Sequence, residues 1–342
     1  MKLISRKKEI FTVNPEFDRY LRSYGRGNRL DFDYDDLLCF NDSFPLYDKE
    51  GNDTLWVSIQ YEPSMRRDID KALLKIYAFL RAGGDLSMMR HLVVERVDLC
   101  LYGNTKPFRV RISNPYNDNF DTFYIKQADA SRIYGLELEH VLSPNRLNYF
   151  YYNGTLVEDH INGIPGDIFR EHYLEAPRTN KIRLSKEFVK FNERCLIMLL
   201  GDMHASNFVV DVTLDHESDF YRIRAIDFDQ QSYDGQLKVY LPQFFPENSR
   251  FVKYALDNLV EDTIKQYQKE EQSLIKTRIN LSSSRINSLL HCMKKDTIAP
   301  FENVKSLRSQ LAEHYKDPSF EMAMSMGELV ERSLARVVES GS

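Results

Sequence analysis

The sequence has little of what marks several specialised classes of protein. It contains only four cysteines in 342 residues, and no two of them form a Cys-x-x-Cys pair. This spacing gives no sign of a zinc site. We expect most of the thiols to be small buried side chains in a reducing compartment. Their positions are Cys39, Cys100, Cys195 and Cys292.

Long apolar runs are also missing. No stretch approaches the ~18 apolar residues that a membrane span needs. The opening MKLISRKKEIF is basic but lacks the apolar core of a signal peptide. We therefore expect no membrane span and a cytoplasmic protein. The formal net charge of −5 is small and negative, which argues against a protein that coats nucleic acid.

What remains is ordinary for a globular protein. Hydrophobic residues make up 42% of the chain and charged residues 28%. The length indicates two domains or lobes. Apolar residues at helical spacing predict helices over 64–82, 130–142 and 186–200, and short alternating runs predict strands over 92–102 and 108–112.

Residues 199–231 hold the most informative pattern. Asp202 and Asn207 lie five positions apart on a short loop that begins at Gly201. Two apolar runs of strand character follow, 208–210 and 221–226, and the polar residues between them are typical of a turn.

The second of these runs ends in Asp227-Phe228-Asp229. If the two runs pair antiparallel, the loop before the first strand lies beside the residue after the second. This pairing predicts that Asp202, Asn207 and Asp227 meet at one end of a β-hairpin.

These three side chains suit phosphoryl transfer, which depends on positioning and charge neutralisation. One carboxylate orients the attacking hydroxyl and accepts its proton. An amide oxygen and a second carboxylate hold Mg²⁺, which prefers hard oxygen ligands. Asp and Asn before strands are also common turn residues, because they bond their own backbone, and the spacing alone leaves this alternative open.

The pattern Gly-Asp-x-His-x-x-Asn at 201–207, followed by Ile-Asp-Phe at 226–228, resembles the catalytic and metal loops of the protein-kinase-like superfamily. The aminoglycoside phosphotransferase and choline kinase branch is the most similar. The resemblance implies that Asp202 is the catalytic base and that Asn207 and Asp227 are the metal ligands. We expect His204 to be a hydrogen-bonded structural residue rather than a proton carrier.

The sequence departs from that family at three places. Leu200 stands where aminoglycoside kinases usually carry histidine, and Asp229 stands where protein kinases have the glycine of Asp-Phe-Gly. No Ala-Pro-Glu element follows, which counts against a conventional protein kinase.

Lys126 ends the apolar run Phe-Tyr-Ile-Lys and resembles the lysine by which kinases hold the α- and β-phosphates. Such a lysine needs a carboxylate partner. The predicted helix 130–142 offers Glu137 and Glu139, and we expect Glu139 to be the partner, with Glu137 as the alternative. A solvated lysine at the end of a strand is the alternative to the pair.

Two further segments take nucleotide roles only by resemblance. The turn at Gly103 would lie over the phosphates, although it has one glycine where protein kinases have several, and an ordinary hairpin turn explains it as well. Asn153-Gly154 predicts a hairpin. After it, backbone groups of Asp159, His160 and Ile161 would meet the adenine edge, and a plain loop is the alternative.

The expected fold is α+β, a two-lobed protein-kinase-like fold with a small antiparallel β-rich N-lobe and a larger helical C-lobe. The expected division is a partly helical N-terminal extension over 1–90, a nucleotide-binding N-lobe over 91–162 and a C-lobe over 163–342.

The expected function is transfer of phosphate from ATP, with Mg²⁺ as cofactor, to a hydroxyl of an unidentified small molecule. Three alternatives are an atypical protein kinase, an enzyme that transfers AMP, and a non-catalytic binding module on the same fold. No nucleic-acid partner is expected.

Overall fold

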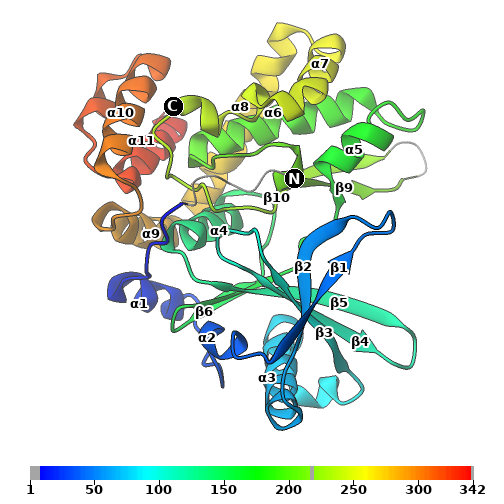
Figure 1. The fold of residues 1–342 in the computed structure, drawn as a ribbon. Coiled ribbons are helices and arrows are strands. Elements are labelled where there is room, and N and C mark those ends of the chain that lie inside the picture. Colours follow the sequence, from blue (N-terminus) through cyan, green and yellow to red (C-terminus); the bar gives the residue numbers. More distant parts are fainter. Residues whose placement is uncertain (1–7, 216–218, 340–342) are drawn as a thin grey trace. The chain divides into compact units, whose positions relative to one another are not determined.

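The computed structural model describes residues 8–215 and 219–339 (Figure 1). The chain divides into two units. The first runs to Ala130 and includes Asn148–His160, and the second consists of Ser131–Leu147 and the chain from Ile161 onward. Each unit is described by itself.

The first unit is built on one seven-stranded sheet in the order β1-β2-β3-β4-β5-β7-β6, in which neighbouring strands are antiparallel. The strands are β1 (Asp42–Tyr47), β2 (Asp53–Gln60), β3 (Val93–Cys100), β4 (Phe108–Asn114), β5 (Asn119–Gln127), β6 (Tyr149–Tyr152) and β7 (Thr155–Asp159). The predicted strands over 92–102 and 108–112 are confirmed as β3 and β4.

The two faces of this sheet differ because successive side chains in a strand point to opposite sides. One face is apolar, and its buried side chains, such as Val110 and Phe123, form one core cluster with Leu73 and Ile76 of α3 (Pro63–Ala82) (Figure 1). The other face is polar. Asp98, Arg109, Tyr124 and Glu158 lie opposite one another across four strands.

Helix α3 begins at Pro63 and ends where Gly83 takes the left-handed conformation, φ 57°. Proline suits the first helical position and glycine suits the position just after the end. The predicted helix over 64–82 is thus confirmed within one residue. The unit's other helices are α1 (Pro15–Ser23), α2 (Tyr34–Leu37) and the 3₁₀ turn η1 (Leu86–Met89).

Residues 8–90 are not a separate extension of this unit. Strand β2 pairs with β3 through Trp56–Cys100 and Ser58–Asp98, and β1 pairs with β2. Because α3 also supplies one side of the core, the segment expected as an extension and the segment expected as the lobe form one body.

The second unit is mostly helical. Its helices are α4 (Ala130–Leu142), α5 (Gly166–His172), α6 (Lys181–Met198), α7 (Ser249–Asn258), α8 (Glu261–Leu281), α9 (Ser283–Lys295), α10 (Phe301–Tyr315) and α11 (Met326–Glu339). Short 3₁₀ turns are η2 (Ala205–Asn207), η3 (Leu237–Tyr240), η4 (Pro242–Phe244), η5 (Pro246–Asn248) and η6 (Pro318–Met322). A three-stranded sheet, in the order β10-β9-β8, consists of β8 (Ile164–Pro165), β9 (Phe208–Thr213) and β10 (Phe220–Ala225).

Helix α6 is the centre of this unit and packs against α7, α8, α11 and β10 (Figure 1). Its buried Phe188 and Phe191 contact Phe251 of α7 and Phe208 of β9, with ring centroids 5.4 and 5.3 Å apart. Aromatic pairs of this kind add to the burial of apolar area. The cluster holds α6 and β9 together, and these are the elements on either side of the 201–207 loop.

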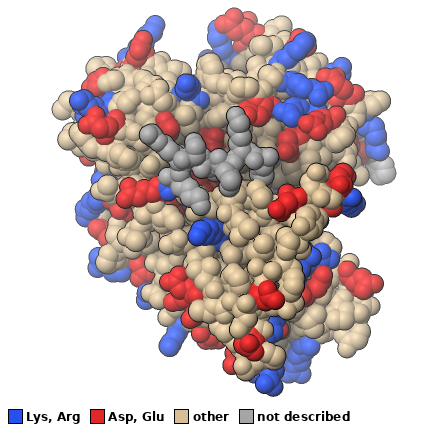
Figure 2. All heavy atoms as spheres, in the orientation of Figure 1, with Lys and Arg blue, Asp and Glu red and all other residues tan. Residues whose placement is uncertain are grey.

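The α+β class is therefore confirmed. Of the four cysteines, Cys100, Cys195 and Cys292 are buried and Cys39 is exposed. None of the helices within 8–215 and 219–339 combines the length and apolar character that a bilayer crossing requires. Basic and acidic side chains are mixed over the face drawn in Figure 2.

Replacing Leu73 with alanine tests the core of the first unit. Leu73 is fully buried in the cluster under the sheet, so the truncation should lower the free energy of unfolding by about 2–5 kcal/mol. Urea unfolding measures this. Lys71→Ala on the same helix removes an exposed side chain and should stay within about 0.5 kcal/mol of the wild type. Equal effects of the two changes would contradict the assigned core.

Candidate active site

The predicted β-hairpin is confirmed. Strands β9 and β10 pair in continuous antiparallel register from Phe208–Ala225 to Thr213–Phe220. Beyond the last pair, the backbone N–H of Ile226 donates to the carbonyl of Asn207 at 3.0 Å. The 201–207 loop and Asp227 therefore lie at the same end of the hairpin.

A second set of backbone contacts ties the chain before Asp202 to the chain after Asp229. Leu200 and Gln231 form an isolated antiparallel bridge. The N–H of Gly201 donates to the Gln230 carbonyl at 3.3 Å, and that of Ser232 donates to Leu199 at 2.8 Å. A Cβ at Gly201 would lie 2.9 Å from the Gln230 carbonyl oxygen, so this approach requires glycine.

The loop itself holds Asp202 in an uncommon backbone conformation, with φ 62°. Residues other than glycine rarely adopt a positive φ. When they do, they are often found at functional sites. The N–H of Asp202 donates to Val239 at 2.9 Å, and its carbonyl accepts from the N–H of His204 at 2.9 Å. The His204 side chain in turn accepts from the N–H of Ser206, at 3.4 Å.

Asn207 is oriented by the same loop. Its Nδ2 donates to the backbone carbonyl of Asp202 at 2.8 Å. Because this bond uses the nitrogen of the amide, Oδ1 is the atom that Asn207 can offer to a cation. The loop thus places an amide oxygen and the Asp202 carboxylate on neighbouring parts of one turn.

The charge around Asp202 is unbalanced toward negative. Burial raises the pKa of the Asp202 carboxyl from its ordinary 3.8 to about 6; the His204 charge opposes this rise, and the charges of Asp227, Glu247 and Asp229 add to it. Carboxylates this close disfavour one another's ionised form. A group of such carboxylates attracts a cation.

The sequence analysis missed Arg132, whose side chain contacts two of these carboxylates. Its guanidinium Nη1 donates to Oδ1 of Asp227 and Oδ1 of Asp229, at 2.7 Å each. The Arg132 side chain is only 2% exposed. The available signal was an arginine in the first turn of the predicted helix 130–142, because a buried arginine needs a carboxylate partner.

The predicted partner of Lys126 is wrong. Lys126 Nζ lies 2.7 Å from Oε2 of Glu158, and both side chains are largely buried. Glu139 instead accepts from Nδ2 of Asn145 at 2.7 Å, and Glu137 accepts from Nε of Arg285 at 2.6 Å. The lysine does have a carboxylate partner, but it comes from the adjacent strand β7 rather than from α4.

The remaining predicted positions lie where the chain turns. Gly103 is in the turn between β3 and β4, where its carbonyl accepts from the N–H of Lys106 at 3.1 Å. Asp159 ends β7. Its backbone N–H donates to the carbonyl of Asn148 at 2.9 Å, which is a hydrogen bond within the first unit. His160 Nδ1 lies 3.3 Å from the Tyr124 hydroxyl, and Ile161 begins the longer segment of the second unit.

The side chains predicted to hold a metal at the end of the hairpin carry oxygen atoms of the kind that a divalent cation takes as ligands. Magnesium binds carboxylate and amide oxygens, and a net negative charge around the site favours it. In the part of the chain that the structure describes, no group of three His, Cys, Asp or Glu side chains is arranged to hold a metal. Of the three side chains predicted at the hairpin end, Asp202 and Asp227 carry carboxylates and Asn207 carries an amide oxygen.

Two comparisons with known proteins gave the same result. A scan against protein-family models finds no family that matches this chain, and a search of curated proteins finds no match either.

Replacing Asp202 with asparagine should stabilise the protein at neutral pH. The folded state holds the Asp202 proton more tightly than the unfolded chain does, with a pKa of about 6 against 3.8. Its contribution to stability is therefore complete below pH 3.8 and is lost as the pH rises through 6. Asparagine has no charge to bury, so the variant should gain roughly 1–3 kcal/mol at pH 7.5.

Urea unfolding between pH 4 and pH 7.5 measures this gain. The advantage of Asp202→Asn should grow over that range. An exposed control, Asp262→Asn on α8, should show no such growth. A variant that is less stable than the wild type at pH 7.5 would contradict the electrostatic account of Asp202.

Proposed function

We propose that the protein is a phosphotransferase of the kinase-like fold, which uses Mg-ATP to phosphorylate a hydroxyl group of a small molecule. The observation that carries the proposal is the convergence, at one end of the β9–β10 hairpin, of Asp202, Asn207 and Asp227. These are the three side chains that the resemblance assigns to the base and to the metal, and they come from two separate stretches of the chain.

In this reaction the acceptor hydroxyl oxygen bonds to the γ-phosphorus of ATP, the bond to the β–γ bridging oxygen breaks, and ADP leaves. Asp202 orients the hydroxyl and takes its proton. Asn207 Oδ1 and the Asp227 carboxylate would hold Mg²⁺, which neutralises charge on the phosphates when bound. The left-handed backbone at Asp202 and its bond to Val239 fix the direction of the base.

Lys126 keeps the phosphate-binding role that the resemblance implies, with Glu158 rather than Glu139 as the carboxylate that fixes its direction. A cross-strand partner within one sheet holds the ammonium without help from a helix. A small-molecule acceptor is favoured over a protein because no Ala-Pro-Glu element follows Asp229 in the sequence.

The activity test uses Asp202→Asn in an assay of ATP consumption over pools of metabolites and of proteins. The substitution keeps the shape of the side chain but removes the proton acceptor, so turnover should fall by about 10²–10⁴-fold. Binding of ATP should be retained. Because the same change is expected to stabilise the fold, unfolding would not explain lost activity. Full turnover in the variant would remove Asp202 from the mechanism.

A second candidate, a non-catalytic binding module, is favoured by one observation. Arg132 already neutralises Asp227 and Asp229 by two short ion pairs, as a cation would. In such a module the arginine would replace the metal, and nucleotide would bind without Mg²⁺ or not at all.

Calorimetry of ATP binding with and without Mg²⁺ distinguishes the two candidates. For the enzyme, Mg²⁺ should tighten ATP binding, and Asp227→Ala should abolish that gain of about tenfold or more. The control Asp262→Ala, exposed at the start of α8, should preserve it. ATP binding of equal strength with and without Mg²⁺ in the wild type would favour the module.

A further inference from the structure

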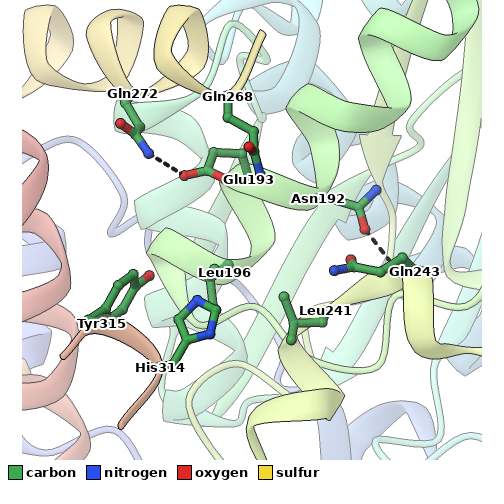
Figure 3. A pocket seen from close by; sticks show the side chains of 9 residues that line it. All are labelled: Asn192, Glu193, Leu196, Leu241, Gln243, Gln268, Gln272, His314 and Tyr315. Carbon is green, nitrogen blue, oxygen red and sulfur yellow. Dashed lines mark hydrogen bonds between the residues drawn. The ribbon is translucent and has the colours of Figure 1, made fainter. Parts of the chain in front are cut away.

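The second unit contains a pocket, lined by both polar and apolar side chains, that has no part in the proposed reaction. Its volume is about 240 Å³, and it lies among α6, α8, the end of α10 and the turns around η4 (Figure 3). The residues that line it are Asn192, Glu193, Leu196, Leu241, Gln243, Gln268, Gln272, His314 and Tyr315. None of the side chains assigned to base or metal is among them.

Glu193 is the unusual member of this lining. It is only 7% exposed, and Nε2 of Gln272 donates to its Oε1 at 2.7 Å (Figure 3). Burial raises the pKa of Glu193 above its ordinary value; the hydrogen bonds from Gln272 and Gln268 oppose this rise, and the charge of Glu271 adds to it. Among the described side chains no cation pairs with Glu193.

The neighbouring Glu271 shows what a buried carboxylate normally requires. It accepts from Nη1 of Arg194 at 3.1 Å, in a pair whose two side chains are each 2% exposed. Burying a carboxylate without a cation is costly, because neutral hydrogen bonds replace only part of its hydration. Glu193 faces a cavity instead of an arginine, so a ligand can supply the missing positive charge.

We propose that this pocket binds a small primary alkylamine as its ammonium ion, with Glu193 as the counter-charge. The ammonium group donates hydrogen bonds to the Glu193 carboxylate and to the side-chain oxygen of Gln268 (Figure 3). Leu196 and Leu241 provide apolar surface for the alkyl part.

The size of the cavity limits the ligand. Pockets for drug-sized molecules have volumes of about 300–1,000 Å³, and this one is smaller. Asn192 is already used, since its Oδ1 accepts from the N–H of Gln243 at 2.9 Å and its Nδ2 donates to Phe188 at 2.6 Å. The pocket therefore suits an amine with a short alkyl chain.

The pocket and the 201–207 loop share a supporting segment of the chain. Leu241 and Gln243 belong to residues 237–248, which also support that loop. Nδ2 of Asn248 donates to the carbonyls of both Met203 and Pro242, at 2.8 Å each. The residues behind Asp202 and the pocket-lining Gln243 therefore belong to one hydrogen-bonded segment.

The test compares two probes of equal shape, n-butylammonium and n-butanol, by ligand-observed NMR titration of the whole protein at pH 8. A charge-assisted hydrogen bond is stronger than a neutral one. We therefore expect n-butylammonium to bind with a Kd of about 1 mM, and n-butanol to bind roughly 10- to 100-fold more weakly.

Glu193→Gln should remove that preference, because it keeps the shape of the side chain but not its charge. Glu313→Gln makes the same change of charge at an exposed position beside His314 on α10 and should leave the preference intact. Thermal melting of both variants without ligand checks that they are folded.

Three results would overturn the proposal: no saturable binding of n-butylammonium, equal binding of the two probes by the wild type, or unchanged binding by folded Glu193→Gln. None of these measurements depends on phosphotransferase activity, so the proposed function and this site stand or fail separately.

Discussion

The candidate site depends on the backbone contacts between residues 199–201 and residues 230–232. The hairpin alone would bring the ends of β9 and β10 together, but it would leave the chain on either side free to diverge. The Leu200–Gln231 bridge and the bond from Ser232 to Leu199 prevent this. As a result, Asp202 and Asp227 belong to a loop that backbone hydrogen bonds close at both ends.

The second constraint is electrostatic. Closing that loop gathers several carboxylates in a partly buried place, which costs free energy unless positive charge is nearby. The cost is visible in the raised pKa of Asp202. Arg132 offsets part of it at Asp227 and Asp229. The same reasoning applies at Glu193, where the charge is buried beside a cavity and the protein supplies only amides. In both places a nearby positive charge would offset the cost of burying the carboxylate.

The sequence analysis was accurate for features that depend on residues close together in the chain, and it failed for contacts between residues far apart in the chain. Strands, helices and the hairpin were predictable because periodicity and turn residues are local properties. The partner of Lys126 was not: Glu158 is far along the chain and comes beside the lysine only through the pairing of β5 with β7. Arg132 was missed for the same reason, since nothing near it in sequence shows that α4 packs on residues 226–231. The N-terminal ninety residues carried no motif, so their place in the sheet depended on the pairing of β2 with β3.

The sequence by itself determined the order and type of the elements around the site and the three side chains at its centre, because the 201–207 loop and the strands after it form from neighbouring residues. Only the tertiary structure decided which charges surround them. Ion pairs join residues that chain folding brings together. The sequence around Glu137, Glu139 or Glu158 does not show which cation each carboxylate contacts. For that reason the identity of the central residues came from spacing, whereas their electrostatic setting came from the fold.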